Sequence, residues 1–99
     1  MSKVIVNGLV EHKRKTIHWE IFDKNVSFGA NGQGNLWLSC PETVMEFDWK
    51  GSPVPTLWPP PDDTVRVEWD EDEKCPSVYC KRQGKWVLLL RLMPTDNTE

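Results

Sequence analysis

The chain has 99 residues, a formal net charge of −3 at pH 7, and a 38% share of hydrophobic residues. This length favours one domain, because typical domains run to ~100–150 residues. The sequence contains six tryptophans and ten valines but a single alanine, Ala30. Alanine is the best helix former, whereas β-branched and aromatic residues suit strands, so this composition excludes a helical bundle. The many large apolar residues also exclude a disordered or collagen-like chain.

Apolar and polar residues alternate in several short segments, which is the pattern of half-buried strands. In chain order we expect strands at residues 3–11, 16–22, 26–30, 36–38, 43–49, 64–70, 77–81 and 86–93. Turn residues separate most of these segments. We therefore predict a single all-β domain over residues 1–94, with residues 95–99 as a flexible C-terminal tail. Its fold is expected to be a small sandwich or barrel-like domain of about seven or eight short, mostly antiparallel strands.

The positions of Gly8 and of the tryptophans predict local features of individual strands. Asn7-Gly8 interrupts the first strand and predicts a bulge or bend there. Four tryptophans lie in register with aliphatic neighbours and are expected in the core, namely Trp19, Trp49, Trp69 and Trp86. The face of Trp37 is left open by its two leucine neighbours. In the last strand, period-two alternation predicts one face made of Trp86, Leu88, Leu90 and Leu92.

Residues 50–63 break the alternation, because five of these fourteen residues are proline. Proline excludes a helix or a central strand, so this segment is predicted to be a long loop. It also holds Trp58, with Val54 and Leu57 nearby. Tryptophan is enriched at the centres of protein interfaces, so Trp58 either anchors this loop to the body of the domain or contacts a partner.

The charge is distributed unevenly along the chain. Residues 41–75 carry −7, whereas residues 1–40 and 76–99 each carry +2. An acidic run ordinarily forms a solvated tip that aids solubility, but it also suits a basic partner, since complementary charge speeds association. The acidic residues that we assign to such a surface are Asp62, Asp63, Glu68, Asp70, Glu71, Asp72 and Glu73.

These features predict a small, intracellular, non-enzymatic protein-binding module that uses Val54, Leu57, Trp58 and the acidic residues. It would be an inhibitor or adaptor that caps a basic site on a larger protein, such as one that processes nucleic acid. Small acidic inhibitors of viral or mobile-element origin provide an analogy for this role. No signal peptide or membrane-spanning run is present, so we expect the cytoplasm, or the host-cell cytoplasm for a viral protein. We expect no cofactor or membrane partner, and an exposed edge strand could pair two copies into a homodimer.

Two alternatives remain open. The first is a nucleic-acid-binding barrel that uses two basic turns, made of Lys13, Arg14 and Lys15 and of Lys81, Arg82 and Lys85. If these turns met on one face with an exposed aromatic ring, the surface would suit single-stranded nucleic acid, although the net negative charge counts against it. The second is a small metal-dependent or Cys-His enzyme. Cys75 and Cys80 have the spacing of a ligand pair, but no second pair accompanies them, so we predict that Cys40, Cys75 and Cys80 are buried thiols and that no metal is bound.

Overall fold

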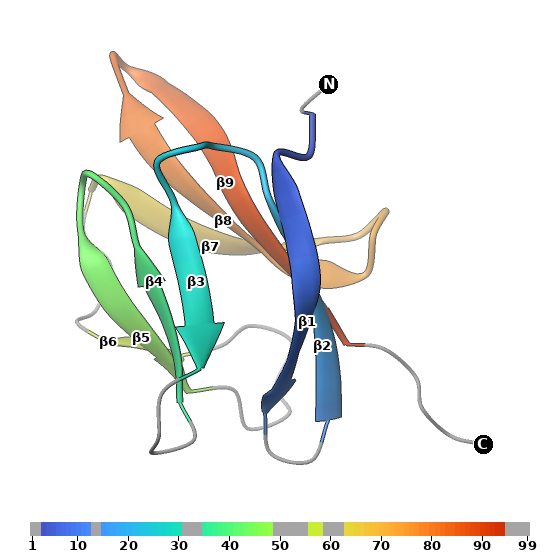
Figure 1. Ribbon diagram of the computed structural model, residues 1–99. Helices are drawn as coiled ribbons and strands as arrows, with labels where there is room; N and C mark the ends of the chain where they lie inside the picture. Colours follow the sequence, from blue (N-terminus) through green and yellow to red (C-terminus); the bar gives the residue numbers. More distant parts are fainter. Residues whose placement is uncertain (1–2, 13–14, 31–34, 49–55, 59–62, 95–99) are drawn as a thin grey trace.

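The computed structural model describes residues 3–12, 15–30, 35–48, 56–58 and 63–94. These residues form nine antiparallel strands, arranged in two sheets (Figure 1). At His12, Lys15, Asp48, Thr56–Trp58 and Pro94 the structure describes the backbone alone. The five-stranded sheet has the order β1 (Val6–His12), β2 (Lys15–Ile21), β9 (Lys85–Pro94), β8 (Cys75–Arg82), β7 (Val65–Asp70). The four-stranded sheet has the order β3 (Ser27–Ala30), β4 (Leu36–Ser39), β5 (Val44–Asp48), β6 (Thr56–Trp58). The predicted all-β class with antiparallel strands is confirmed.

The strand that the sequence did not predict is β6, which lies inside the proline-rich segment. Within the described residues it pairs only with β5, through Glu46 and Trp58, Phe47 and Leu57, and Asp48 and Thr56. Such an edge position tolerates neighbouring prolines, because one side of the strand needs no ladder hydrogen bonds. The backbone of Trp58 therefore belongs to a strand, not to a loop as predicted. The predicted tail at residues 95–99 lies outside the described residues.

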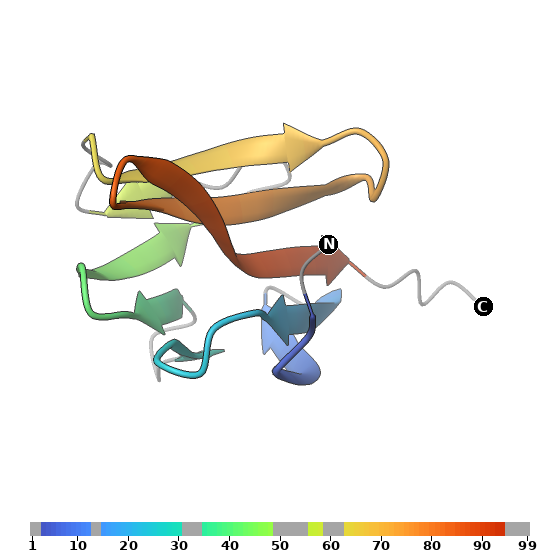
Figure 2. The same cartoon turned by 90° about the horizontal axis from the view of Figure 1, so that it is seen from above.

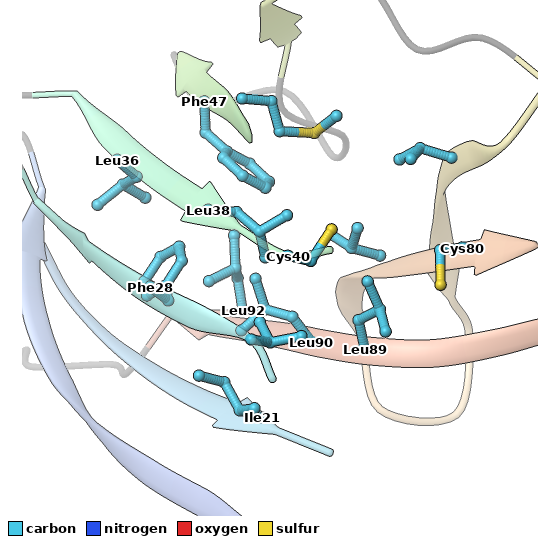
Figure 3. Close-up of a cluster of buried hydrophobic side chains, with 14 of the residues drawn as sticks. Ile21, Phe28, Leu36, Leu38, Cys40, Phe47, Cys80, Leu89, Leu90 and Leu92 are labelled. Atoms are coloured by element: carbon cyan, nitrogen blue, oxygen red, sulfur yellow. The ribbon is translucent and has the colours of Figure 1, made fainter. Parts of the chain in front are cut away.

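The two sheets bury their apolar faces against each other, as Figure 3 shows for part of the core. Phe28, Leu38 and Phe47 come from the four-stranded sheet, and Ile21, Leu90 and Leu92 from the five-stranded sheet. The Phe28 ring lies 5.9 Å from the Trp19 ring of β2 and 6.1 Å from the Phe47 ring of β5, measured between centroids. These distances are typical of tilted and edge-to-face aromatic pairs, so aromatic packing also joins the sheets. The described residues include no helix with the length and apolar character needed to cross a lipid bilayer.

A β-bulge in β9 changes which side chains face the core. Val78 pairs with Leu90 but the next residue, Tyr79, pairs with Leu88, so Leu89 is an extra residue in β9. Leu89, Leu90 and Leu92 are all fully buried, whereas Trp86 is 39% exposed. The predicted face of Trp86, Leu88, Leu90 and Leu92 is therefore wrong, because the extra residue reverses the alternation between Leu88 and Leu90. Figure 2 shows β9 bending along its length, from its position beside β8 toward β2.

Two glycines make room for tryptophan rings on the neighbouring strand. Gly8 of β1 pairs with Trp19, and Gly29 of β3 pairs with Trp37. A Cβ atom at Gly8 would lie 2.6 Å from Cζ2 of Trp19, and one at Gly29 would lie 2.9 Å from Cζ2 of Trp37. The pairing of β1 with β2 continues without a shift through Gly8, so the predicted bulge is wrong. Position 8 holds a glycine because the indole ring of Trp19 lies over it and leaves no room for a Cβ atom.

The predicted core positions of the tryptophans hold only in part. Trp19 is half-buried and packs against the core, and Trp69 is also half-buried. Trp37 is half-buried beside Gly29. Trp49 lies outside the described residues. Trp86 is exposed, so its predicted place in the core is wrong, and the bulge at Leu89 is the reason.

Candidate binding surfaces

The turn between β7 and β8 holds most of the predicted acidic surface, and Asp70 fixes its backbone. Oδ1 of Asp70 accepts hydrogen bonds from the backbone N–H groups of Asp72, at 2.9 Å, and Glu73, at 3.1 Å. Its backbone carbonyl accepts a bond of 2.7 Å from the N–H of Lys74, which has a left-handed φ of 57°. The bonds from Glu73 and Asp72 and the nearby Arg91 hold the pKa of Asp70 below its ordinary value. The carboxylate of Asp70 therefore forms hydrogen bonds within the turn.

Arg91 ties the turn to the outer face of the five-stranded sheet. Its Nη2 atom lies 3.4 Å from Oδ2 of Asp70, and its Cζ atom lies 5.4 Å from the centre of the Phe22 ring. Because Arg91 is on β9 and Asp70 is on β7, the arginine side chain must cross β8 between them. The β8 residues paired with these two, Ser77 and Cys75, are fully buried even though they are on the outer face. This arrangement anchors the acidic turn to the sheet.

The carboxylates that remain exposed at this turn are those of Glu71, Asp72 and Glu73. Nζ of Lys74 lies 3.5 Å from Oε1 of Glu71, but both side chains are more than two-thirds exposed, so this pair contributes little. The other predicted acidic residues lie elsewhere. Asp63 is exposed just before the start of β7, and Glu68 forms an ion pair with Arg66 on the same strand.

The remaining predicted partner residues lie in or near the proline-rich segment. Val54 and Asp62 are outside the described residues. Leu57 and Trp58 are described by their backbones, which pair with Phe47 and Glu46 in β5. Among the predicted partner residues whose side chains the structure describes, it therefore brings together only those of the acidic turn.

The two predicted basic turns do not meet. Lys85 begins β9, whereas the backbone of Lys15 lies beyond the opposite end of β9, because Ile17 pairs with Pro94. Nine residues of extended strand separate these ends by roughly 30 Å. Lys13 and Arg14 of the first turn lie outside the described residues.

The second basic turn is a tight hairpin that sends its cations to opposite faces. Gln83 and Gly84 have φ angles of 53° and 78°, as a two-residue turn with two left-handed positions requires. Lys81 pairs with Trp86 and Arg82 pairs with Lys85, so Lys81 is on the outer face and the other two cations are on the inner face. The predicted basic surface is therefore divided by the sheet.

Arg82 links the two sheets and is not a free cation. Its Nε and Nη2 atoms donate to the two carboxylate oxygens of Glu42, at 2.6 and 3.1 Å, and its Nη1 donates to Oδ2 of Asp23. Asp23 lies in the connection from β2 to β3, which joins the two sheets, and Glu42 lies between β4 and β5 of the other sheet, so this ion-paired cluster fastens β8 to both segments. The guanidinium lowers the pKa of Glu42, and the Asn25 N–H together with Arg82 lowers that of Asp23.

A cation–aromatic cluster on the outer face was not predicted from the sequence. Among the tryptophans whose side chains are described, Trp86 alone is exposed. The Cζ atom of Arg66 lies 4.9 Å from the centre of its ring, and Nζ of Lys81 lies 5.9 Å from it. Both distances are within the range of a cation–π interaction. The sequence held one indication of this cluster. Lys81 and Trp86 flank a tight turn, which places them opposite each other, and Arg66 is on the polar side of a clearly alternating strand.

All three cysteines are free thiols that are buried as predicted. Five positions separate Cys75 from Cys80, so they are on opposite faces of β8 and cannot form a ligand pair. Burial raises the pKa of each of these two thiols to about 11. The described part of the chain holds no group of three or more His, Cys, Asp or Glu residues arranged to bind a metal ion.

Comparison of the chain with known protein families, with curated proteins and with solved structures finds no match. The candidate binding surfaces are therefore two regions of the five-stranded sheet, the acidic turn and the Trp86 cluster.

Proposed function

We propose that this chain is a non-enzymatic protein-binding module whose acidic turn binds a basic surface on a larger protein. The observation that carries the proposal is that Glu71, Asp72 and Glu73 are exposed on a turn whose backbone Asp70 fixes. A fixed turn loses less conformational entropy when it binds than a flexible loop does. Three neighbouring carboxylates would also steer a positively charged partner toward the turn.

The surroundings of the turn support the same role. Arg91 holds Asp70 from the sheet side, so the three exposed carboxylates extend from a strand pair that is anchored to the core. One surface that suits such a turn is a basic groove that ordinarily binds nucleic acid, because the turn and nucleic acid both present closely spaced negative charges. The protein would then act as an inhibitor or adaptor in the cytoplasm, where we also place its partner.

The test is affinity capture from a lysate at two salt concentrations, with the captured proteins identified by mass spectrometry. The variant Glu71→Gln with Glu73→Gln removes two charges from the turn and keeps the size of both side chains. The matched control, Glu11→Gln with Glu46→Gln, removes two exposed charges from β1 and β5. We expect a basic protein that the wild type and the control retain at low salt and that the turn variant loses.

Salt dependence separates this result from non-specific capture. Binding through exposed carboxylates should weaken as salt rises, because the Debye length falls from ~10 Å at 0.1 M to ~3 Å at 1 M. If the turn variant and the control retain the same proteins at the same salt concentrations, the acidic turn is not the binding site and the proposal fails.

A further inference from the structure

We propose that the outer face of the five-stranded sheet around Trp86 is a second binding site, which takes single-stranded nucleic acid. This site is defined by Trp86, Lys81, Arg66 and the adjoining side chains of Tyr79 and Leu88. It is separate from the acidic turn and does not depend on the function proposed for that turn.

The strand register places all five side chains on one face. Lys81 pairs with Trp86, Tyr79 pairs with Leu88, and Arg66 pairs with Tyr79. These residues occupy three adjacent strands, β7, β8 and β9, so they form one continuous surface. Trp86 is exposed, and Tyr79 and Leu88 are half-buried beside it. The bulge at Leu89 produces this exposure, because it turns Leu90 and Leu92 inward while Trp86 stays outside.

The chemistry of this surface fits an unpaired base and its phosphates. An exposed indole ring on a sheet offers a flat platform on which a base of any sequence can stack. The guanidinium of Arg66 and the ammonium of Lys81 lie over the ring, 4.9 and 5.9 Å from its centre. A base that stacks on the indole would displace these two side chains from the ring, and both are long enough to contact the phosphates of that base instead. Bases in a duplex are already stacked on each other, so the platform favours single strands.

Glu68 and the acidic turn are sources of negative charge on the same sheet as this site. Glu68 forms an ion pair with Arg66, but both side chains are about half exposed, and exposed pairs are weak enough to exchange for a phosphate. The acidic turn lies at the other end of β8, six residues from Lys81, which corresponds to roughly 20 Å. This separation exceeds the Debye length of ~8 Å at physiological ionic strength, so the turn's exposed charges are largely screened from the Trp86 face.

The test uses fluorescence anisotropy of a labelled oligothymidine of about 15 nucleotides, a length that spans the usual site size of a small single-strand-binding domain. We expect binding at low salt, and weaker binding of a duplex of the same length. Trp86→Ala should weaken the affinity by about 5- to 150-fold, the range that stacking on one aromatic residue supports. Trp86→Phe should restore part of this loss, because phenylalanine also offers a ring for stacking.

Two lysine variants make the test independent of Trp86. Lys81→Gln should weaken binding and reduce the slope of log K against log salt by about 0.7, the value for one phosphate contact on a single strand. Lys85→Gln removes the same charge from the opposite face of the same hairpin and should leave binding nearly unchanged. The urea unfolding midpoint of each variant shows whether it is folded.

Three results would overturn the proposal. One is no binding of the oligonucleotide by the wild type up to about 100 µM at low salt, where even non-specific sites bind. Another is equal binding by folded Trp86→Ala and the wild type. The last is an equal loss of affinity in Lys81→Gln and Lys85→Gln, which would indicate general attraction to positive charge and not to this face. If the first result is accompanied by capture of a protein through Trp86, the occupant of this face is a protein and not nucleic acid.

Discussion

Replacing Arg82 by methionine should lower the free energy of unfolding by about 2 kcal/mol at pH 7. Methionine keeps an unbranched apolar chain but removes the guanidinium that joins Glu42 and Asp23. Fully exposed ion pairs contribute ~0–1 kcal/mol, whereas removing one partner of a buried pair costs ~3–5 kcal/mol. The side chains of Arg82, Asp23 and Glu42 are 29%, 12% and 22% exposed, so their cluster lies between these limits. For a domain of this size, ~2 kcal/mol corresponds to a fall in melting temperature of roughly 8–16 °C.

The assay is urea unfolding followed by circular dichroism, since guanidinium chloride would screen the ion pairs. The N–H of Asn25 together with Arg82 lowers the pKa of Asp23 below its ordinary value of 3.8, and Arg82 lowers that of Glu42 below 4.5. A lowered pKa stabilises the folded state above the ordinary value, and this contribution disappears as the pH falls through the folded-state pKa. The difference between wild type and Arg82→Met should therefore be full at pH 7 and shrink progressively below about pH 4.5.

The matched control is Arg66→Met, which removes an arginine whose carboxylate partner, Glu68, is more exposed than those of Arg82. Its ion pair with Glu68 is about half exposed, so we expect a loss of no more than ~1 kcal/mol. Equal losses in the two variants would refute the reasoning that burial strengthens the Arg82 cluster. A loss for Arg82→Met that stays constant from pH 7 to pH 3 would show that the charges contribute nothing and that only side-chain packing was removed.

Three further substitutions or treatments test the packing. Gly8→Ala should destabilise the fold by ~1–3 kcal/mol, because the new methyl group meets the Trp19 ring, whereas exposed Asn7→Ala should change stability by less than ~0.5 kcal/mol in the same urea titration. Ser77→Ala should be neutral or stabilising, since the buried Ser77 hydroxyl has no hydrogen-bond partner among the described residues; a loss above ~1 kcal/mol would reveal a bond to that hydroxyl. At pH 8, Cys75 and Cys80 should react slowly with a disulfide reagent in the folded protein and quickly in urea, because burial raises the pKa of both thiols to about 11; fast reaction of either thiol without urea would contradict this.

Local sequence signals were sufficient to predict the class of fold. Period-two alternation in residues 16–22 and 64–70 corresponds to β2 and β7, and the turn around Gly84 joins β8 to β9 as expected. These signals are local because strand alternation and left-handed turn positions each depend on a few neighbouring residues. The three-residue strand β6 escaped prediction because its pairing with β5 is set by another strand, not by its own pattern.

The composition of the surfaces could not be predicted in the same way. In the run Val87–Leu90 every residue is apolar, so no polar side chain marks where the bulge shifts the alternation and leaves Trp86 outside. Arg82 was assigned to a basic surface because its partners Glu42 and Asp23 are 40 and 59 residues away in the chain. Such pairings depend on how the two sheets are packed together.

The position of β9 within its sheet has a consequence for the order in which the protein is made. β9 pairs with β2 on one side and with β8 on the other, so it lies between strands formed early and late in the chain. During synthesis, the β1–β2 hairpin is complete long before residues 85–94 leave the ribosome, so the edge of β2 that pairs with β9 stays unpaired until then. Non-local pairing of this kind slows folding and leaves an unpaired strand edge exposed to other chains. A chaperone that binds nascent β-hairpins should therefore improve the yield of native protein, and release of the chain before β9 is translated should lead to aggregation.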